Sequence, residues 1–451
     1  MRFRSSGTGI AWGRGVHGTH AASVGCRNAP VPWWYQRGRI SSSGHTRRAP
    51  PLCLGLARDS CGFRLGVREL LSTGLDAECM RVAVVTESFL PQINGVTNSV
   101  LRVCEQLTLQ GHEALVIAPG SGPTVCSGAP GAPGGPGVPV VRTPSWPLPA
   151  YRDFRVARHF PQMLATLRTF GPDVVHLASP VVLGAQAAYA ARRLGVPSVA
   201  VYQTDLAAYA TRYRLGLAEF AVWRRLCKVH AVAARTLAPS RAAVRQLEAH
   251  GIERVARWAR GVDLQRFSPS RRDEQLRSRL APDGQLLVGY VGRLAPEKEL
   301  GLLAAVQNLP GVRLLVVGDG PQRRQLEREL PKVHFTGLQT GNEFAATFAC
   351  LDVFVHTGSH ETFCQAAQEA LASAVPVVAP AAGGLLDLVQ HGGNGLLFQP
   401  GSAVELAGRV RTLHALPGTR RRMGEQARRS VQGRSWEVAG RELTQHYREV
   451  A

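Results

Sequence analysis

Several features that would indicate other classes of protein are absent from this chain of 451 residues. No apolar run reaches the roughly eighteen residues that a membrane-spanning helix needs, and none of signal-peptide length follows the early arginines. The nine cysteines lack the paired spacing of a metal site, which favours reduced thiols. We therefore expect a cytoplasmic protein that is at most peripherally attached to the inner face of the cell membrane. No Asp-x-Asp sequence occurs either, so the pair of carboxylates that usually binds a divalent metal ion at the diphosphate is missing.

Acidic residues and lysines are also few. Lys228, Lys298 and Lys332 are the only lysines, the net charge is +21, and the first 79 residues contribute +7 of it. A net charge this positive is typical of proteins that bind nucleic acid, an anionic membrane or an acidic substrate, but the sequence contains no recognisable nucleic-acid-binding module. We therefore expect no nucleic-acid partner and favour peripheral contact with an anionic membrane, where a well-placed basic residue adds about 1 kcal/mol. A solvated arginine surface is the alternative.

Residues 1–79 differ from the rest of the chain. They are rich in Arg, Ser and Gly, show no sustained periodicity, and end where Met80 begins an apolar stretch. We expect them to be an untranslated or disordered leader. From residue 80 onward strands alternate with helices, and the length and the 45% hydrophobic content allow two domains with cores of their own. The pattern predicts an α/β protein of two Rossmann-like domains, with ligands at the carboxyl ends of parallel strands.

The most informative stretch contains two glutamates, Glu361 and Glu369, where a buried strand is followed by an amphipathic helix that starts near Thr362. Free backbone N–H groups at Phe363 and Cys364 would lie at the positive end of that helix, where a diphosphate is stabilised. Glu361 then suits a sugar hydroxyl and Glu369 a ribose. Two glutamates at this spacing, taken alone, more often mark a solvated helix face.

Two glycine turns at strand ends come earlier in the chain. The first is followed by Arg293 and Lys298, which can bracket a leaving diphosphate; surface charges at a helix start are the alternative. The second contains Gly318, Asp319 and Gly320, a turn that lets backbone approach a nucleobase or ribose. Glycine after a parallel strand is common, so the second turn is not diagnostic by itself.

The amino-terminal half offers further candidates at strand ends. Asn94 and Gly95 form a strand-to-helix turn whose amides suit a donor phosphate or an acceptor hydroxyl, and asparagine tolerates the positive φ such a turn can require. Asp205 ends the segment Tyr-Gln-Thr-Asp, and Tyr151 lies in a basic, aromatic segment. His176 ends a buried strand, although a lone histidine there is more often structural.

In this order, these segments resemble the retaining GT-B glycosyltransferases of family 4, and among them the actinobacterial GDP-mannose-dependent α-mannosyltransferases that act on glycolipids. The resemblance runs from Met80 nearly to the C-terminus. It implies that Arg293 and Lys298 contact the donor diphosphate, Glu369 the ribose and Glu361 the transferred sugar. It also implies that His176 lies beside the reacting sugar. The remaining implied positions are Gly95, Gly318, Asp319, Gly320, Phe363 and Cys364 for the donor, and Asn94, Tyr151 and Asp205 for the acceptor.

The resemblance further implies the domain organisation, two Rossmann-like domains that face each other across a cleft. We expect an acceptor domain over 80–262, a hinge near Gly261, a sugar-nucleotide domain over 263–425, and a final segment, 426–451, whose helix crosses back to the first domain. No metal and no cofactor are expected, because two cations and a helix N-terminus replace the metal at the diphosphate.

The predicted function is retaining, metal-independent transfer of mannose from GDP-mannose to a lipid or glycolipid, such as a glycosyl diacylglycerol or a phosphatidylinositol mannoside. Three alternatives remain: a UDP-sugar-dependent glycosyltransferase, a GT-B nucleotide-sugar epimerase, which would need acid and base carboxylates on either side of the sugar, and a non-catalytic basic binding protein. The sequence leaves open the donor base, the acceptor and the oligomeric state.

Overall fold

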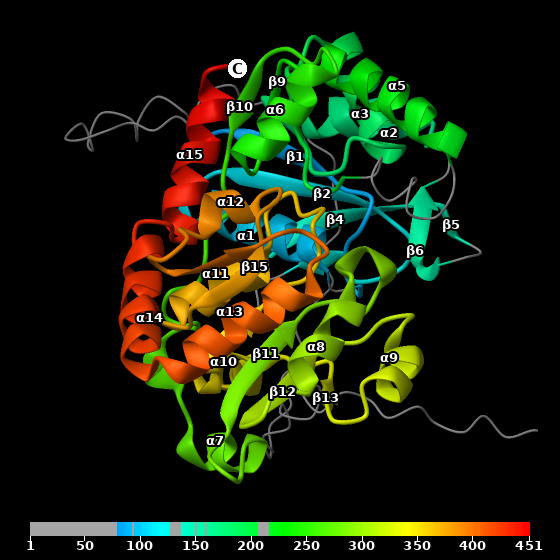
Figure 1. Cartoon of the computed structure of the whole chain (residues 1–451). Helices are drawn as coiled ribbons and strands as arrows, with labels where there is room; N and C mark the ends of the chain where they lie inside the picture. Colours follow the sequence, from blue (N-terminus) through cyan, green and yellow to red (C-terminus); the bar gives the residue numbers. More distant parts are fainter. Residues whose placement is uncertain (1–78, 93, 127–136, 149–150, 158–159, 206–215) are drawn as a thin grey trace, which may run out of the picture. The chain divides into compact units, whose positions relative to one another are not determined.

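A computed structural model of the chain describes residues 79–92, 94–126, 137–148, 151–157, 160–205 and 216–451 (Figure 1). The expected leader therefore lies almost entirely outside the described residues. The described part contains two parallel sheets with helices on both faces, so the α/β architecture of two Rossmann-like units is confirmed. Within that part, no helix combines the length and the apolar character needed to cross a membrane.

The first sheet has eight strands in the order β10-β9-β8-β7-β1-β2-β4-β3, and all pairs are parallel except β3 with β4. Its strands are β1 (Arg81–Val85), β2 (Glu113–Pro119), β3 (Val125–Cys126), β4 (Val138–Thr143), β7 (Val174–Leu177), β8 (Ser198–Val201), β9 (Arg235–Ala238) and β10 (Val255–Arg257). The strand order reverses between β1 and β7, which is where doubly wound sheets bind ligands. A separate antiparallel pair, β5 (Ser145–Leu148) and β6 (Tyr151–Ala157), follows β4.

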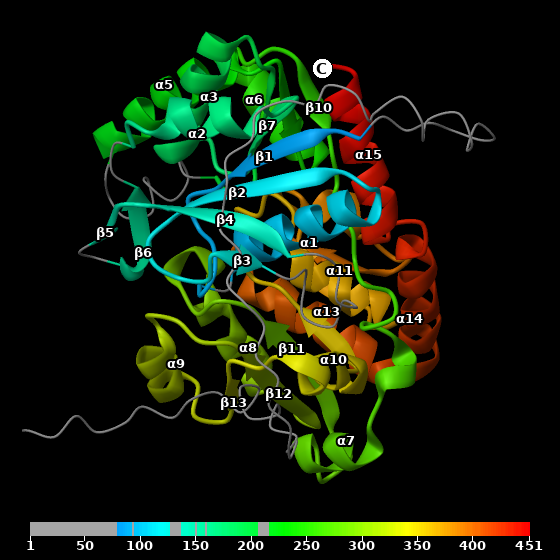
Figure 2. The ribbon, with the colours of Figure 1, turned by 180° about the vertical axis from the view of Figure 1, so that it is seen from behind.

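Each face of this sheet is covered because successive side chains of β1 point to opposite sides. Val82 and Val84 pack with residues of α1 (Gly95–Leu109) and α15 (Trp436–Arg448), two helices that lie next to each other (Figure 2). Ala83 packs on the opposite side with α2 (Met163–Phe170), α3 (Leu183–Leu194) and α5 (Gly216–Val232). The last helix of the chain is thus part of the core of the first sheet.

The second sheet has six parallel strands in the order β13-β12-β11-β14-β15-β16, again reversing beside the first strand of the set. They are β11 (Leu286–Val291), β12 (Val312–Val317), β13 (His334–Gly337), β14 (Val353–Val355), β15 (Val377–Pro380) and β16 (Gly395–Phe398). Its helices are α7 (Glu274–Leu280), α8 (Ala304–Gln307), α9 (Arg323–Glu329), α10 (Gly341–Cys350), α11 (Gln365–Ala372), α12 (Leu385–Leu388), α13 (Ala403–Ala415) and α14 (Pro417–Val431).

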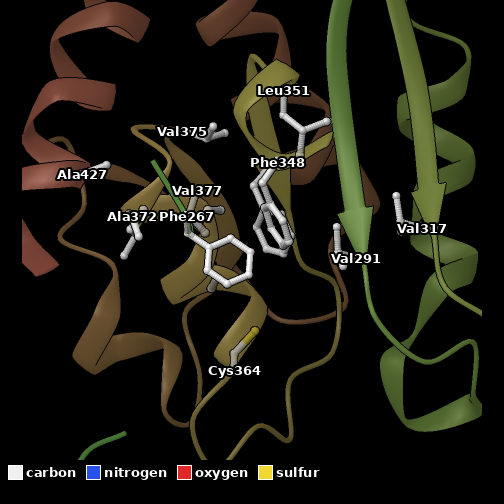
Figure 3. Close-up of a cluster of buried hydrophobic side chains, with 14 of the residues drawn as sticks. Phe267, Val291, Val317, Phe348, Leu351, Cys364, Ala372, Val375, Val377 and Ala427 are labelled. Atoms are coloured by element: carbon white, nitrogen blue, oxygen red, sulfur yellow. The ribbon is translucent and has the colours of Figure 1, made fainter. Parts of the chain in front are cut away.

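The aromatic centre of the second unit anchors the segment before α11. Phe348 is fully buried, and its ring lies 5.4 Å from that of Phe267 in an edge-on arrangement. Figure 3 shows these two rings together, with the Cys364 side chain at the end of the same cluster. Because Phe363 and Cys364 are both buried, packing fixes the position of the loop that leads into α11.

The two units meet through the segment between β10 and α7 and through the C-terminal helix. Trp258 is fully buried and its indole Nε1 donates to the Ala439 carbonyl at 2.8 Å. Val262 forms a parallel bridge with Ser435, whose hydroxyl caps the start of α15. Asp387 of α12 accepts at 2.8 Å from the backbone N–H of Arg241, at the start of α6 (Arg241–Ala249). The last two contacts connect the second unit to the first, while the Trp258 bond fixes the connecting segment on α15.

Candidate functional site

The carboxyl ends of the second sheet place several predicted residues at one edge, because all its strands run in the same direction. Arg293 follows β11, and Gly318 follows β12 directly. Glu361 lies between β14 and α11. Lys298 ends the short 3-10 helix η3 (Pro296–Lys298), which brings its side chain to Glu361.

Glu361 is the centre of a charged cluster with Lys298 and His356. Lys298 Nζ donates to Glu361 Oε1, and His356 Nε2 lies 2.9 Å from the same oxygen. The three side chains are largely buried. Burial alone would raise the pKa of Glu361, but Lys298 and His356 outweigh it and hold this pKa well below its usual range. The carboxylate is therefore charged at neutral pH and held in place by two donors.

His356 was not among the residues predicted for the site. Burial opposes its charged form, but Cys364 and Glu361 together raise the pKa of His356 to about 9. The imidazole is thus protonated at neutral pH and acts as the second cation on Glu361. Its place directly after β14 was the available signal, since Gly318 directly follows β12 in the same way.

Arg293 and the start of α11 complete the predicted diphosphate site. Arg293 pairs with the buried Glu297 one turn on, and about a third of the Arg293 side chain stays exposed. Cys364 has a φ of 76° and α11 begins at the next residue, so the N–H groups here have no acceptor within the helix. A positive φ is strained for a residue other than glycine, and the buried Cys364 side chain holds the loop in this conformation.

Glu369 lies about one turn into α11 and is half-buried. Burial raises the pKa of Glu369 to about 8, although Arg266 and Arg102 act in the opposite direction. The carboxyl is therefore mostly protonated at neutral pH without a ligand. A protonated carboxyl both donates and accepts a hydrogen bond, which suits a pair of ribose hydroxyls.

The glycine turns hold separate pieces of backbone in direct contact. A Cβ atom at Gly318 would lie 2.0 Å from the Gly292 carbonyl oxygen, and one at Gly320 would lie 2.4 Å from the Leu294 oxygen. Asp319 accepts at 2.7 Å from the Gly320 N–H with its side chain. These turns therefore require glycine for packing between the ends of β11 and β12, whatever ligand they also contact.

A third glycine pair, Gly383 and Gly384, was missed by the sequence analysis although it follows β15 in the same way. The Gly384 N–H donates to the Glu361 carbonyl at 2.7 Å. A Cβ atom at Gly383 would lie 2.4 Å from that same carbonyl oxygen. The loop that carries Glu361 thus rests directly on this pair.

In the first unit, Asn94 caps α1 with its side chain. Its Oδ1 accepts at 3.0 Å from the N–H groups of both Val96 and Thr97, and its Nδ2 donates to Ser88 Oγ at 2.6 Å. The expectation of a positive φ at Asn94 is wrong, because its φ is −151°, the extended conformation of an N-cap. Gly95 begins the helix and is exposed.

The other two acceptor candidates are less defined by the structure. Asp205 accepts at 2.9 Å from Gln246 Nε2, which ties it to α6. Tyr151 begins β6, but the position of its side chain lies outside what the structure describes. Neither residue is placed at the Glu361 cluster by any described contact, so both remain predictions.

His176 is not brought to the Glu361 cluster. The side chain is fully buried within β7, and its Nδ1 lies 2.7 Å from the Tyr447 hydroxyl of α15. Burial lowers the pKa of His176 to about 3, so the imidazole is neutral. The residue thus connects the last helix to the first sheet, and nothing of it is open to a sugar. We do not retain it in the catalytic set.

Replacing Tyr447 with phenylalanine tests this assignment. The change leaves a buried imidazole nitrogen without its partner, which is expected to cost about 1–3 kcal/mol of stability and to leave the transfer rate per folded molecule unchanged. Urea unfolding and initial rates measure the two effects, with the exposed Tyr189→Phe as the control. Full stability with a strong loss of transfer would instead return His176 to the site.

The described residues contain no group of three or more His, Cys, Asp or Glu side chains arranged to hold a metal ion. The described part of the chain has two surface cavities of about 440 Å³ each, one lined by Arg257, Arg260 and Arg434 and the other by Arg422 and Arg429. Glu361, Lys298 and Glu369 line neither of them. The site is therefore defined by the strand ends and their charged groups.

Comparison with known families gives two adjoining matches. Residues 93–266 match the family Glycosyltransferase Family 4, and residues 271–430 match the family Glycosyl transferases group 1. The boundary between them falls in the segment that joins the two sheets. Together the matches cover most of the chain.

The curated relatives match this chain over most of their own length. The chain is 50% identical over 372 residues to a GDP-mannose-dependent alpha-mannosyltransferase of Mycobacterium tuberculosis, covering 82% of this chain and 97% of that protein. It is 51% identical to the protein of the same name from Mycolicibacterium smegmatis, over 82% of this chain and 98% of that one. It is 32% identical to the sulfoquinovosyl transferase SQD2 of Arabidopsis thaliana, over 80% and 71% of the two chains.

Solved structures share the fold at lower identity. Anabaena Alr3699/HepE in complex with UDP superposes with a TM-score of 0.67 at 20% identity, over 82% of this chain and 100% of that one. Sucrose-phosphate synthase from Thermosynechococcus elongatus gives a TM-score of 0.67 at 21% identity, over 82% and 98%. These neighbours confirm the GT-B architecture expected from the sequence.

Proposed function

Because this chain belongs to the family 4, group 1 glycosyltransferases, we propose that it transfers mannose from GDP-mannose to a lipid or glycolipid, with retention and without a metal. Relatives half identical over almost their full lengths carry the name GDP-mannose-dependent alpha-mannosyltransferase. The observation that carries the proposal is the buried cluster of Lys298, His356 and Glu361 at the strand ends.

The cluster assigns a role to each oxygen of Glu361. Both cations contact Oε1, so we assign Oε2 to a hydroxyl of the transferred sugar. A carboxylate already neutralised by two cations is a poor nucleophile, which argues against a covalent intermediate on Glu361. Its role is to orient the sugar within the closed site.

The charge that develops on the leaving diphosphate is balanced by Arg293, Lys298 and the amides before α11. In the proposed reaction the bond from the anomeric carbon to the phosphate oxygen breaks, and the acceptor oxygen bonds to the same face of that carbon. The departing phosphate takes the acceptor proton. Glu369 and the turn around Gly318 hold the nucleoside.

A lipid acceptor is supported by the outer surface of the first unit. On α5, Phe220 is 75% exposed, and Arg224, Arg225 and Lys228 are exposed on the same side of the helix. The neighbouring α3 adds exposed Arg192 and Arg193. Basic residues with an exposed aromatic ring suit an anionic membrane surface, so we propose peripheral contact with the inner face of the cell membrane.

The test is a transfer assay with the full chain, in EDTA, with GDP-mannose or UDP sugars as donors. A bacterial lipid extract is supplied in vesicles with or without added anionic lipid. We expect a mannosylated lipid from GDP-mannose despite the chelator, formed faster on anionic vesicles. Transfer from a UDP sugar alone would mean that the donor is a UDP sugar and not GDP-mannose. Conversion of the donor sugar without an acceptor would indicate an epimerase. A requirement for a metal ion would contradict the proposed mechanism.

A further inference from the structure

A buried arginine that the proposed mechanism does not use lies where the two units meet. Arg260 follows Ala259 in the segment after β10, and only 8% of it is exposed. Among the described residues, no carboxylate lies within ion-pair distance of its guanidinium, and Glu361 and Glu369 act on it from farther away. Burial lowers the pKa of Arg260 to about 10, so the side chain still carries a full charge at neutral pH.

One edge of the guanidinium is fixed by the first unit. Arg260 Nη2 donates to Gln203 Oε1 at 2.5 Å, and Gln203 Nε2 donates in turn to the Ala178 carbonyl at 3.0 Å, just beyond β7. The Gln203 carbonyl accepts at 2.9 Å from the hydroxyl of Thr362, the neighbour of Glu361. The side chain is therefore oriented toward the ends of β7 and β8 and toward the loop before α11.

The backbone of the same segment is fixed by the second unit. Gln368 Nε2 donates to the Arg260 carbonyl at 3.0 Å, and Gln365 Nε2 donates to the Gly261 carbonyl at 3.1 Å. Both glutamines belong to α11, the helix that also carries Glu369. Arg260 is thus held by the first unit through its side chain and by the second unit through its backbone.

The other edge of the guanidinium lies against the amino-terminal glycine turn. A Cβ atom built on Gly95 would lie 3.4 Å from Arg260 Nη1. Gly95 is one of the residues assigned to a phosphate of the donor. A buried cation without a counter-ion is costly, and it is retained where an anion binds.

We propose that Arg260 is a third cation of the diphosphate site, binding the distal phosphate of the donor from the side of the first unit. In a sugar nucleotide the diphosphate joins the ribose to the transferred sugar. Arg260 acts on both Glu369, assigned to the ribose, and Glu361, assigned to the sugar, and it lies beside Gly95. A cation among these three residues lies where the diphosphate must pass.

The inference rests on the proposed function in one respect, because it requires a nucleoside diphosphate sugar as the donor. It adds that the leaving group is held from both units, by Arg293 and Lys298 on one side and by Arg260 on the other. Departure of the nucleoside diphosphate would then remove the anion that neutralises Arg260.

The experiment compares GDP with GMP, which lacks the distal phosphate, by isothermal titration calorimetry on the full chain. We expect Arg260→Gln to weaken GDP binding by about tenfold or more and GMP binding by less than about threefold. Arg260→Lys keeps the charge and is expected to fall between. Arg257→Gln, three residues earlier and half-exposed, is the matched control and is expected to bind both nucleotides as the wild type does.

The outcomes are separable from those of the proposed function. Equal weakening of GDP and GMP in Arg260→Gln, or no weakening, would overturn the inference, while Arg293→Gln should still lose GDP selectively. If the wild type binds UDP more tightly than GDP, the same comparison is made with UDP and UMP, because the inference concerns the distal phosphate and not the base. Failure of the wild type to bind any nucleoside diphosphate would refute both proposals.

Discussion

Replacing Lys298 with alanine is expected to lower the rate of transfer by about 10²- to 10³-fold, the usual loss when one preorganised donor to a developing charge is removed. Lys298 is assigned two tasks, as a cation on the leaving diphosphate and as a donor to Glu361. The substitution removes both at once and leaves His356 as the remaining cation on the carboxylate. Initial rates at saturating donor measure the effect.

The control is Lys332→Ala, because Lys332 is an exposed lysine whose ammonium contacts Asn308 Oδ1 at 3.0 Å, on another part of the same unit. It is expected to leave the rate unchanged. A double variant with Glu361→Gln sharpens the test: residues that act as a unit are non-additive, so the double variant should be little worse than Lys298→Ala alone. Fully additive losses would mean that the two residues work separately, and a fully active Lys298→Ala would remove the lysine from the site.

The same substitution has a definite pH signature in stability. The folded pKa of Glu361 is held below its unfolded value, so its contribution to stability is present above the unfolded pKa and is lost as the pH falls through the folded one. Removing Lys298 raises the folded pKa. We therefore expect the variant to lose stability at neutral pH and to converge with the wild type in acid.

The fold of the second unit could be predicted from the sequence, and its candidate site residues follow a local rule. Glycine turns and charged residues lie in the loops that follow buried parallel strands, and the carboxyl ends of such strands meet at one edge of the sheet. The proximity of Lys298 and Glu361 could therefore be predicted without knowing any side-chain contact. In the structure the two side chains are in contact. His356 and Gly384 obey the same rule but were not singled out, since neither carries a familiar spacing.

Residues whose roles depend on distant parts of the chain could not be predicted. His176 also follows the strand pattern, but only the return of the C-terminal helix shows that Tyr447 occupies the space beside it. Arg260 looks like one more arginine in a chain rich in them, and its burial depends on Gln203 and on α11 closing around it. Periodicity along a strand does not say which residues far along the chain cover that face.

A second large effect is expected from Gly384→Ala, which adds a single methyl group behind the loop that carries Glu361. The φ of Gly384 is −69°, a value that alanine adopts freely, so only the lack of space opposes the change. The new Cβ atom would lie 2.4 Å from the Thr362 carbonyl oxygen and 2.6 Å from the Phe363 Cα. Both are backbone atoms, which cannot swing aside as a flexible side chain does.

The loop from Glu361 to Cys364 must therefore shift, and it carries both the carboxylate and the amides assigned to the diphosphate. A displacement of about 1 Å at a reacting group can lower the rate about 100-fold, whereas overpacking costs roughly 1–3 kcal/mol of stability. Gly408→Ala, inside α13 with its nearest neighbour the end of Arg411 at 4.0 Å, is the control and should keep full activity. Transfer rates measure the effect on activity, and urea unfolding midpoints measure the effect on stability. A large loss of transfer with a small loss of stability would show that the position of this loop limits the reaction, while normal transfer in Gly384→Ala would mean that the loop adapts and that the Glu361 cluster tolerates displacement.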